Sequence, residues 1–405
     1  MATGSGILSP LQSVKGVRLA SIQAGIRYQN RLDLVIFELA STATTAAVFT
    51  KNAFCAAPVQ IARQHLKQGE PRYLLINTGN ANAGTGDLGR QDALACCQAL
   101  AEAAAVSTNQ VLPFSTGVIG QRLPADKIIK ALPKALSELD SGDWLGAAKG
   151  IMTTDTRPKA VSRILQLADR EITITGIAKG AGMIKPDMAT LLSFIFTDAS
   201  IASPLLHQLL SQAVSRSFNR ITVDGDTSTN DSCVLVATGA SGTEITPADK
   251  QSLQDFIAAL HEVFHILATE IIRDAEGAEK FVTVKVINGG NEQECLAVAY
   301  AVAESPLVKT ALSASDPNWG RILAAIGRAG LVNLDIELID ISLGKIPLVA
   351  KGMVAKDYSE AKGQAEVNQE DIAITIDLKR GTVSETVWTS DLSHEYVRIN
   401  AEYRT

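Results

Sequence analysis

A threonine at the start of an apolar run has the setting in this chain that most favours covalent chemistry. Residues 176–196 read GIAKGAGMIKPDMATLLSFIF, in which glycines and Pro186 lead into Thr190 and the apolar run. If the bond between Ala189 and Thr190 is cut, Thr190 gains a free α-amino group beside its own hydroxyl. Such an amine has a pKa of about 7.7–8.0, so it can take the hydroxyl proton near neutral pH without a histidine. The pattern is typical of a nucleophile that creates its own base, and it also suits a threonine that simply opens a strand.

A second motif, HEVFH at residues 261–265, has the HExxH spacing of zinc peptidases. That spacing places two histidine ligands on one helix face, with a general-base glutamate between them. The apolar stripe of the surrounding helix leaves His261 and His265 at its flank, where a helix meets solvent. A zinc metallopeptidase that uses His261, Glu262 and His265 is therefore an alternative hypothesis, and solvated helix histidines are the favoured interpretation.

Two loops are rich in small polar residues. VDGDTSTND, residues 223–231, is not an EF-hand, because Thr229 and Leu235 stand where that loop needs glycine and glutamate. It is favoured as a rigid polar loop near a site over a metal cage. NTGNANAGTGD, residues 77–87, follows a strand and precedes a helix, so its amides could cradle an anion. It lacks the GxGxxG and GKS/GKT patterns, and tight turns explain its glycines equally well.

Helices and strands alternate along the chain. Helical periodicity predicts a helix at residues 88–106, a second with Ser203 as N-cap, and a third with Thr246 as N-cap and an apolar stripe that ends at Ile271. Apolar runs and period-two alternation predict strands at residues 72–76, 171–175, 190–197, 281–287 and 372–378. This mixture indicates an α/β or α+β architecture of layered sheets and helices.

Composition excludes several classes of protein. The 405 residues include 37 Lys+Arg and 43 Asp+Glu, for a net charge of −6, which argues against nucleic acid as the main partner. No apolar run approaches the roughly 20 residues that cross a bilayer, and the N-terminus does not read as a secretory signal. The five cysteines are scattered without a CxxC pair, so no disulfide framework is expected. We expect a cytoplasmic protein of two or three domains, or of two intertwined ones.

KGAGMIKPDMATLLSF, residues 179–194, resembles the self-cleavage segment of the ornithine acetyltransferase family, the glutamate N-acetyltransferases of arginine biosynthesis. The resemblance covers nearly the whole chain and implies an α/β (α+β) layered sandwich of the self-cleaving N-terminal-threonine acyltransferase and aminopeptidase type. The other matching segments are NTGNANAGTG (77–86), STGVIG (115–120), IMTTDTRPK (151–159), SFNRITVDGDTSTND (217–231), RDAEGAEKF (273–281), SDPNWGRI (315–322) and INAEYRT (399–405).

The resemblance also implies a processing event and a set of site residues. The precursor cuts itself between Ala189 and Thr190, so that residues 1–189 become an α-chain and residues 190–405 a β-chain. The two chains interleave in one fold and assemble as α2β2. Thr190 is the implied nucleophile, with Thr116 and Gly117 as the oxyanion hole. The implied substrate contacts are Thr153, with Thr154 beside it, Lys179, Thr190, Glu276, Asn400 and Thr405.

The implied reaction is ping-pong transfer of acetyl from N2-acetyl-L-ornithine to L-glutamate, with no metal or organic cofactor. Acetyl-CoA stays open as a second donor, and a self-cleaving amidase or aminopeptidase of the same architecture is the alternative. The chain departs from the family at Asp187, where asparagine is common, and at Trp388–Asp391, which reads WTSD for WGCD. Neither change removes a catalytic group. The alternation at Val397–Asn400 predicts an ordered tail that acts as a lid.

Overall fold

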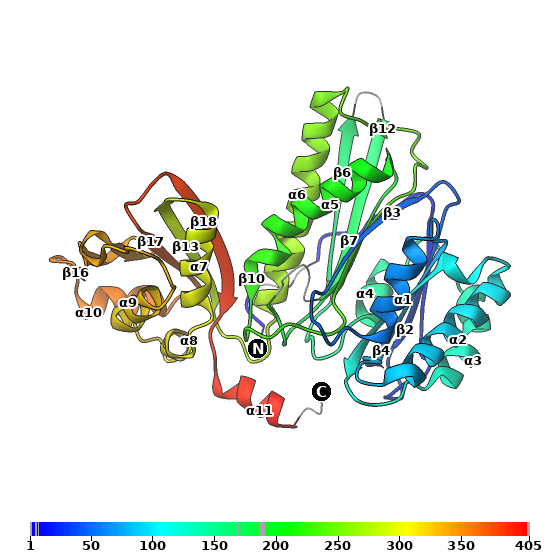
Figure 1. Cartoon of the computed structure of the whole chain (residues 1–405), viewed down its shortest axis with the longest axis horizontal. Helices are drawn as coiled ribbons and strands as arrows, with labels where there is room; N and C mark the ends of the chain where they lie inside the picture. The colour runs from blue at the N-terminus through cyan, green and yellow to red at the C-terminus, as the bar shows by residue number, and fades with distance from the viewer. Residues whose placement is uncertain (1, 5, 7, 168–169, 186–190, 403–405) are drawn as a thin grey trace.

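Three large sheets organise the protein, whose computed structural model describes residues 2–4, 6, 8–167, 170–185 and 191–402 (Figure 1). The first sheet has the order β1 (Val17–Ile22), β2 (Leu34–Leu39), β4 (Tyr73–Asn80) and β5 (Val111–Val118). The second has the order β3 (Thr44–Phe49), β11 (Ser232–Ala237), β8 (Leu192–Thr197), β7 (Arg170–Lys179) and β6 (Lys159–Leu167). The third has the order β10 (Ile221–Thr222), β18 (Val383–Ser390), β13 (Phe281–Gly289), β17 (Asp371–Asp377), β14 (Asp340–Leu343), β15 (Ile346–Ala350) and β16 (Met353–Val354).

The first two sheets pack face to face through aromatic side chains. Phe37 of β2 meets Phe196 of β8 with ring centroids 4.7 Å apart, and Phe114 of β5 meets Phe194 at 5.1 Å. Helices cover the outer face of each sheet and bury its apolar side chains there. The result is a four-layer α–β–β–α sandwich, which confirms the predicted layered architecture. The helices of this sandwich are α1 (Ala57–Leu66), α2 (Gly86–Ala104), α3 (Ala125–Ser137), α4 (Trp144–Gly150), α5 (Ser203–Arg216) and α6 (Lys250–Arg273).

The third sheet forms a separate lobe with its own core (Figure 1). After the last strand of this lobe the chain forms helix α11 (His394–Glu402), which runs back from the lobe toward the sandwich (Figure 1). Among the described residues, no single helix is long and apolar enough to cross a membrane, although the helices at Glu292–Ala303 and Pro306–Ser313 pass that test as a pair bent by 54°. The helices after β13 are α7 (Glu292–Ala303), α8 (Pro306–Ser313), α9 (Trp319–Gly327), α10 (Glu360–Val367) and α11 (His394–Glu402). Short elements complete the chain: β9 (Ser200–Ile201), β12 (Glu244–Ile245), η1 (Thr108–Gln110), η2 (Phe218–Arg220) and η3 (Ile336–Leu338).

Strand β8 lies at the centre of the second sheet. Its first residue, Leu192, is opposite Lys179 of antiparallel β7 on one side and Ser232 of parallel β11 on the other. Every residue of β8 is buried, since a sheet and a helix layer cover its two faces. This sheet takes β3, β6 and β7 from residues before position 190, and β8 and β11 from residues after it.

The predicted helices exist, but two of their starts were wrong. Helix α6 begins after Asp249, whose carboxylate accepts the N–H of Ser252 at 3.1 Å, and not at Thr246. The residues between form a turn after the short strand β12, so the true cap is the acidic residue at the end of that turn. Helix α5 includes Ser203 as its first residue and has Ala202 as N-cap.

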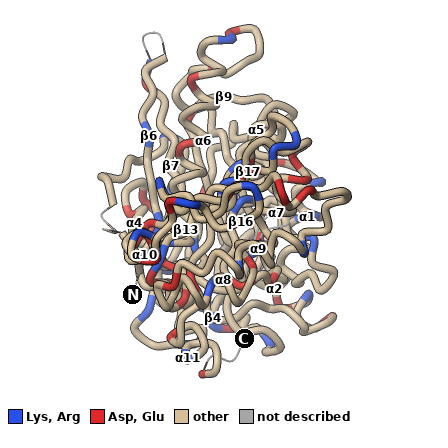
Figure 2. Tube along the Cα trace, turned by 90° about the vertical axis from the view of Figure 1, so that its left-hand side faces the viewer, with Lys and Arg blue, Asp and Glu red and all other residues tan. Residues whose placement is uncertain are grey.

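The charged residues and the cysteines are distributed as expected. Figure 2 shows basic and acidic residues interspersed along the trace, with no long tract of one sign. Cys96 and Cys97 are buried in α2, and burial raises the pKa of Cys96 to about 12. A thiol with this pKa is unreactive near neutral pH.

Candidate active site

A cavity of about 240 Å³ opens where the carboxyl ends of β5 and β7 meet the beginning of β8. Every predicted site residue that the structure describes lies in its wall. These residues are Thr116, Gly117, Thr153, Thr154, Lys179, Glu276 and Asn400. Leu191 and Leu192, which follow position 190 in the chain, also line it. Ala189, Thr190 and Thr405 lie outside the described residues, so their placement stays a prediction.

At the end of β5 the backbone takes a path that requires glycine. Gly117 has φ = +134°, and a Cβ atom there would lie 2.3 Å from the carbonyl carbon of Gly79 and 2.5 Å from the nitrogen of Asn80. The β4–β5 register shifts at this point, with Asn80 opposite both Thr116 and Val118. Such bulges re-aim side chains next to functional sites. Here the bulge brings Thr116 and Gly117 together to the cavity wall.

With the oxyanion role that the family resemblance implies for Gly117, replacing it by alanine is expected to lower kcat by about 10²–10³-fold, the effect of displacing one oxyanion donor. The added methyl group must push the β5 backbone away from β4, while residues that contact the substrate elsewhere stay in place. Steady-state kinetics on the purified variant measures the change. Gly120→Ala is the matched control, because Gly120 also has a positive φ of +79° but its Cβ would meet no atom within 4 Å. Equal losses in both variants would show that backbone strain, and not the Gly117 position, causes the effect.

Lys179 connects the ends of β7 and β5. Its Nζ donates a hydrogen bond to Thr116 Oγ1 at 3.3 Å. Burial lowers the pKa of Lys179, and the nearby carboxylates of Asp155, Asp231 and Glu276 oppose that shift. Since Thr116 Oγ1 accepts from Lys179, the Thr116 hydroxyl hydrogen remains available to donate into the cavity.

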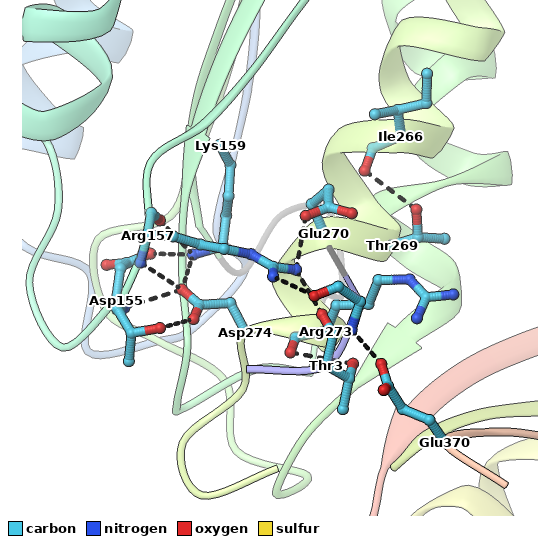
Figure 3. Close-up of polar contacts among 12 residues, drawn as sticks. Thr3, Asp155, Arg157, Lys159, Ile266, Thr269, Glu270, Arg273, Asp274 and Glu370 are labelled. Carbon is cyan, nitrogen blue, oxygen red and sulfur yellow. Dashed lines mark hydrogen bonds and ion pairs between the residues drawn. The ribbon is translucent and has the colours of Figure 1, made fainter. Parts of the chain in front are cut away.

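A buried cluster of charged side chains holds in place the segments that carry Thr153 and Lys179 (Figure 3). Lys159 Nζ is 2.7 Å from Asp155 Oδ1 and 2.6 Å from Asp274 Oδ2, and all three side chains are fully buried. The Asp155 carboxylate also accepts the backbone N–H of Thr153 at 2.9 Å and of Gly180 at 2.8 Å. Burial alone would raise the pKa of Asp155, but the neighbouring lysine ammonium groups and these hydrogen bonds outweigh burial and lower it. The cluster therefore fixes the backbone at Thr153 and beside Lys179.

The far wall of the cavity is acidic and comes partly from α11. Asn400 Nδ2 donates to Glu276 Oε2 at 2.8 Å, and the Tyr396 hydroxyl donates to Asp224 Oδ2 at 3.1 Å. The described part of the tail is ordered as predicted, and residues His394–Glu402 form helix α11. The helix explains the contacts, because residues four apart lie on one helix face.

The polar loop 223–231 forms another wall of the cavity, in agreement with its favoured interpretation. Asn230 Nδ2 ties the loop to the first sheet by donating to the carbonyls of Ala81 at 2.6 Å and Ser115 at 2.9 Å. Asp231 is 3 % exposed, and its Oδ2 has no hydrogen-bond partner among the described residues. Burial raises the pKa of Asp231 well above its usual range, against hydrogen bonds from Ser228 and the charge of Lys179.

The HEVFH motif does not line the cavity, and the asparagines of the loop 77–87 form hydrogen bonds with nearby backbone carbonyls. Glu262 pairs with Arg163 at 2.7 Å, and the exposed His265 packs edge-on against Trp388, with ring centroids 4.8 Å apart. In the part of the chain that the structure describes, no three His, Cys, Asp or Glu side chains gather as a metal site. In loop 77–87, Asn77 Nδ2 donates to a carbonyl of the loop itself and Asn82 Nδ2 to one in the first turn of α2, the arrangement expected of tight turns.

Sequence reasoning did not assign a role to Tyr396, Asp224, Asn230 or Asp231. The last three belong to the polar loop that the analysis singled out, so composition pointed to the loop but not to the individual side chains. Tyr396 carried no signal, because its place in the cavity depends on the helical path of the tail.

Comparison with known proteins adds full-length matches. The sequence model of the ArgJ family matches residues 18–405. The chain is 54% identical to the arginine biosynthesis bifunctional protein ArgJ of Pseudomonas fluorescens and 52% identical to that of Psychrobacter arcticus, with 100% of both sequences covered in each comparison. Two solved structures are also similar. A chain of the Bacillus halodurans ArgJ is 40% identical over 52% of this chain and 98% of its own, with a TM-score of 0.49. A chain of the Mycobacterium tuberculosis ornithine acetyltransferase complexed with ornithine is 38% identical over 44% of this chain and 96% of its own, with a TM-score of 0.41.

Proposed function

The chain belongs to the ArgJ family, and on that premise we propose that it is a self-cleaving acetyltransferase that moves acetyl from N2-acetyl-L-ornithine to L-glutamate in arginine biosynthesis. The observation that carries the proposal is the single cavity that collects Thr116, Gly117, Lys179, Glu276 and Asn400 beside the start of β8. These residues come from separate segments of the chain, and the family resemblance assigned all of them to one site.

The proposed nucleophile is Thr190, freed by cleavage after Ala189. Its α-amine takes the proton of its own hydroxyl, and the oxygen attacks the acetyl carbonyl. The location of Leu191 supports this role, because Leu191 lines the cavity and its carbonyl accepts the N–H of Ser232 at 2.9 Å. Leu191, the residue that directly follows Thr190 in the chain, is therefore held in place by the second sheet.

Oxyanion stabilisation is assigned to Thr116 and Gly117. The tetrahedral intermediate places negative charge on the former carbonyl oxygen, and preorganised donors lower its energy. The Thr116 hydroxyl suits this role, because Lys179 already satisfies one of its lone pairs and leaves its hydrogen free to donate. The Lys179 charge also strengthens the donor electrostatically.

Substrate recognition follows from the charges of the cavity. Glu276, Asp224 and Asp226 line one side, which suits the side-chain ammonium of ornithine. Lys179 supplies a cation for a carboxylate, which both ornithine and glutamate carry. We propose ping-pong order. The Thr190 oxygen bonds to the acetyl carbon, the amide C–N bond breaks, and ornithine leaves with the proton that the α-amine took from the hydroxyl, so that an acetyl-Thr190 ester remains. The glutamate amine then attacks the ester and takes the acetyl group, and the hydroxyl of Thr190 is restored. Cleavage into residues 1–189 and 190–405, an α2β2 assembly, a cytoplasmic location and catalysis without a metal or organic cofactor are parts of the same proposal.

Mass spectrometry tests the covalent part. We expect two chains that meet between residues 189 and 190, and acetyl on the Thr190 peptide after incubation with N2-acetyl-L-ornithine alone. Addition of L-glutamate should remove that acetyl group and form N-acetyl-L-glutamate. Release of acetate without glutamate would instead favour the amidase alternative, and a single uncut chain in an active preparation would contradict the proposed nucleophile.

A further inference from the structure

Residues 181–185, here called the upstream segment, precede the proposed cleavage point and are held in one conformation. Met183 has φ = +54°, a left-handed backbone conformation that residues other than glycine rarely adopt. Its N–H donates to Asp224 Oδ2 at 2.6 Å, and the N–H of Ile184 donates to Asp224 Oδ1 at 2.9 Å. The Ile184 carbonyl in turn accepts the N–H of Val223 at 2.7 Å. The Asp224 carboxylate therefore fixes the turn at Met183 by accepting two successive backbone N–H groups.

The two ends of the upstream segment have partners in other parts of the chain. The carbonyl of Ala181 accepts the N–H of Glu276 at 2.9 Å. The Lys185 ammonium is 3.0 Å from Oε2 of Glu304, the residue that ends helix α7. These partners and Asp224 all follow position 190 in the sequence. The contacts therefore join the two chains that cleavage would create.

Helix α11 contacts the same two acidic residues. The Tyr396 hydroxyl donates at 3.1 Å to Asp224 Oδ2, the oxygen that also accepts the N–H of Met183. Asn400 Nδ2 donates to Glu276 Oε2 at 2.8 Å. Burial and the Asp224 charge raise the pKa of Tyr396, so its hydroxyl keeps its proton and remains a donor. The Tyr396 hydrogen bond thus helps to orient the carboxylate that holds the upstream segment.

The beginning of α11 packs directly on the backbone next to Glu276. Gly277 has φ = +69°, and a Cβ atom there would lie 2.5 Å from the nitrogen of Tyr396 and 2.9 Å from the carbonyl carbon of Glu395. The carbonyl of Gly277 accepts the hydroxyl of Ser393 at 2.7 Å. A side chain at position 277 would therefore displace the start of α11 and, with it, the Tyr396 hydroxyl.

We propose that Asp224 and Tyr396 are positioning residues for self-cleavage. Helix α11 holds the Asp224 carboxylate against the backbone of residues 183 and 184, and this contact presents the bond between Ala189 and Thr190 for attack. The inference rests on the proposed function, because it concerns the cleavage that frees Thr190. Since α11 follows every other described element in the chain, it is synthesised after them, and cleavage waits until it has docked.

The cleavage itself needs only water as a further reactant. The Thr190 oxygen bonds to the carbonyl carbon of Ala189, the C–N bond breaks, and the nitrogen takes the hydroxyl proton, so that an ester joins the two chains. Water then attacks the ester, the C–O bond breaks, Thr190 regains its hydroxyl, and residue 189 becomes a carboxylic acid. Asp224 and Tyr396 exchange no atom or proton in these steps, so both act through the geometry of the upstream segment.

A cleavage assay on full-length chains tests the proposal without any substrate. Cell-free synthesis supplies two parents, the unaltered chain and Thr190→Ser, in which the slower chemistry should keep folding from limiting the rate. Timed samples on a denaturing gel give the rate of division, and limited proteolysis of the same samples follows folding. Tyr396→Phe should slow division roughly tenfold, the loss of one hydrogen bond to a charged group, without delaying protease resistance.

Three further variants separate positioning from general stability. Tyr358→Phe is the matched control, because the Tyr358 hydroxyl also donates to a carboxylate, that of Glu360 at 2.8 Å, but does not line the cavity. Gly277→Ala should slow division although it keeps both the hydroxyl and the carboxylate. Asp224→Ala should slow division more than Tyr396→Phe does. Adding Tyr396→Phe to Asp224→Ala should then have no further effect, since the hydroxyl has lost its acceptor.

Each outcome decides one point. Division of Tyr396→Phe or Gly277→Ala at the parent rate would overturn the inference and leave the proposed function in place. Equal slowing in Tyr358→Phe, or a delay in protease resistance that accounts for the delay in division, would overturn it as well, because either would report a loss of stability. Additive effects in the double variant would show that Tyr396 does not act through Asp224. If neither parent divides, the proposed function itself fails.

Discussion

Thr190→Ala is expected to yield a single uncut chain of 405 residues that transfers no acetyl group. In the proposed mechanism the hydroxyl oxygen attacks the backbone carbonyl of residue 189 during processing, and the same oxygen later carries the acetyl group. Alanine removes it without adding bulk. Loss of a covalent nucleophile lowers kcat by about 10³-fold or more, and in the proposed mechanism the loss of processing also withholds the α-amine that acts as base.

A denaturing gel and an acetyl-transfer assay measure the two effects separately. Thr190→Ser is the matched variant, because it keeps the hydroxyl and removes only the β-methyl group that restricts χ1. It should mature more slowly than the unaltered chain and retain part of the activity. If Thr190→Ala still divides at residue 189, the hydroxyl is not the agent of cleavage. If its uncut chain still turns over substrate, the acetyl group travels by another route.

Local sequence patterns predicted the helices and strands of this fold, because the spacing of apolar residues in each element marks the face that the element buries. The stripe of α6 is buried against the second sheet, and the apolar run after position 190 becomes β8, which is covered on both faces. Pairing was not predictable in the same way. No local signal places Lys179 and Ser232 on opposite sides of Leu192, since strand order depends on contacts between distant segments.

The tail shows where periodicity misleads. Residues Val397–Asn400 alternate in the manner of a strand, yet they belong to α11. A four-residue alternation is compatible with either period, and the contacts of Tyr396 with Asp224 and of Asn400 with Glu276 favour the helix. The resemblance to the family named Asn400, and the structure places it in the wall of the cavity.

Lys159 is the clearest case of a residue whose importance the sequence does not reveal. A lysine at the first position of a strand is ordinarily exposed. Here it is 1% exposed, and one of its two carboxylate partners, Asp274, is 115 residues away. Only the folded chain brings β6 and the end of α6 together around it.

Lys159→Met is therefore expected to destabilise the protein by about 3–5 kcal/mol, because it leaves two carboxylates buried without their counter-ion. Methionine preserves most of the side-chain volume, so the loss reports charge and not a cavity. Urea unfolding of the variant and the unaltered protein at neutral pH measures the change in the free energy of unfolding. Lys134→Met is the matched control, since Lys134 and Glu138 form an exposed surface pair at 3.7 Å, worth about 0–1 kcal/mol.

Acid adds a second measurement on the same variant. The pKa of Asp155 is lowered in the folded protein, so Asp155 stabilises the fold at pH values above its unfolded pKa of about 3.9 and loses that contribution as the pH falls below it. Removing the Lys159 charge removes the largest of the influences that lower the pKa of Asp155, so burial, which favours the protonated carboxyl, is opposed less strongly and the pKa should rise. The free energy of unfolding of Lys159→Met should thus depend less steeply on pH below about 4 than that of the unaltered protein. Parallel pH profiles, together with a neutral-pH loss no larger than that of Lys134→Met, would mean that Lys159 does not hold Asp155 in its charged form.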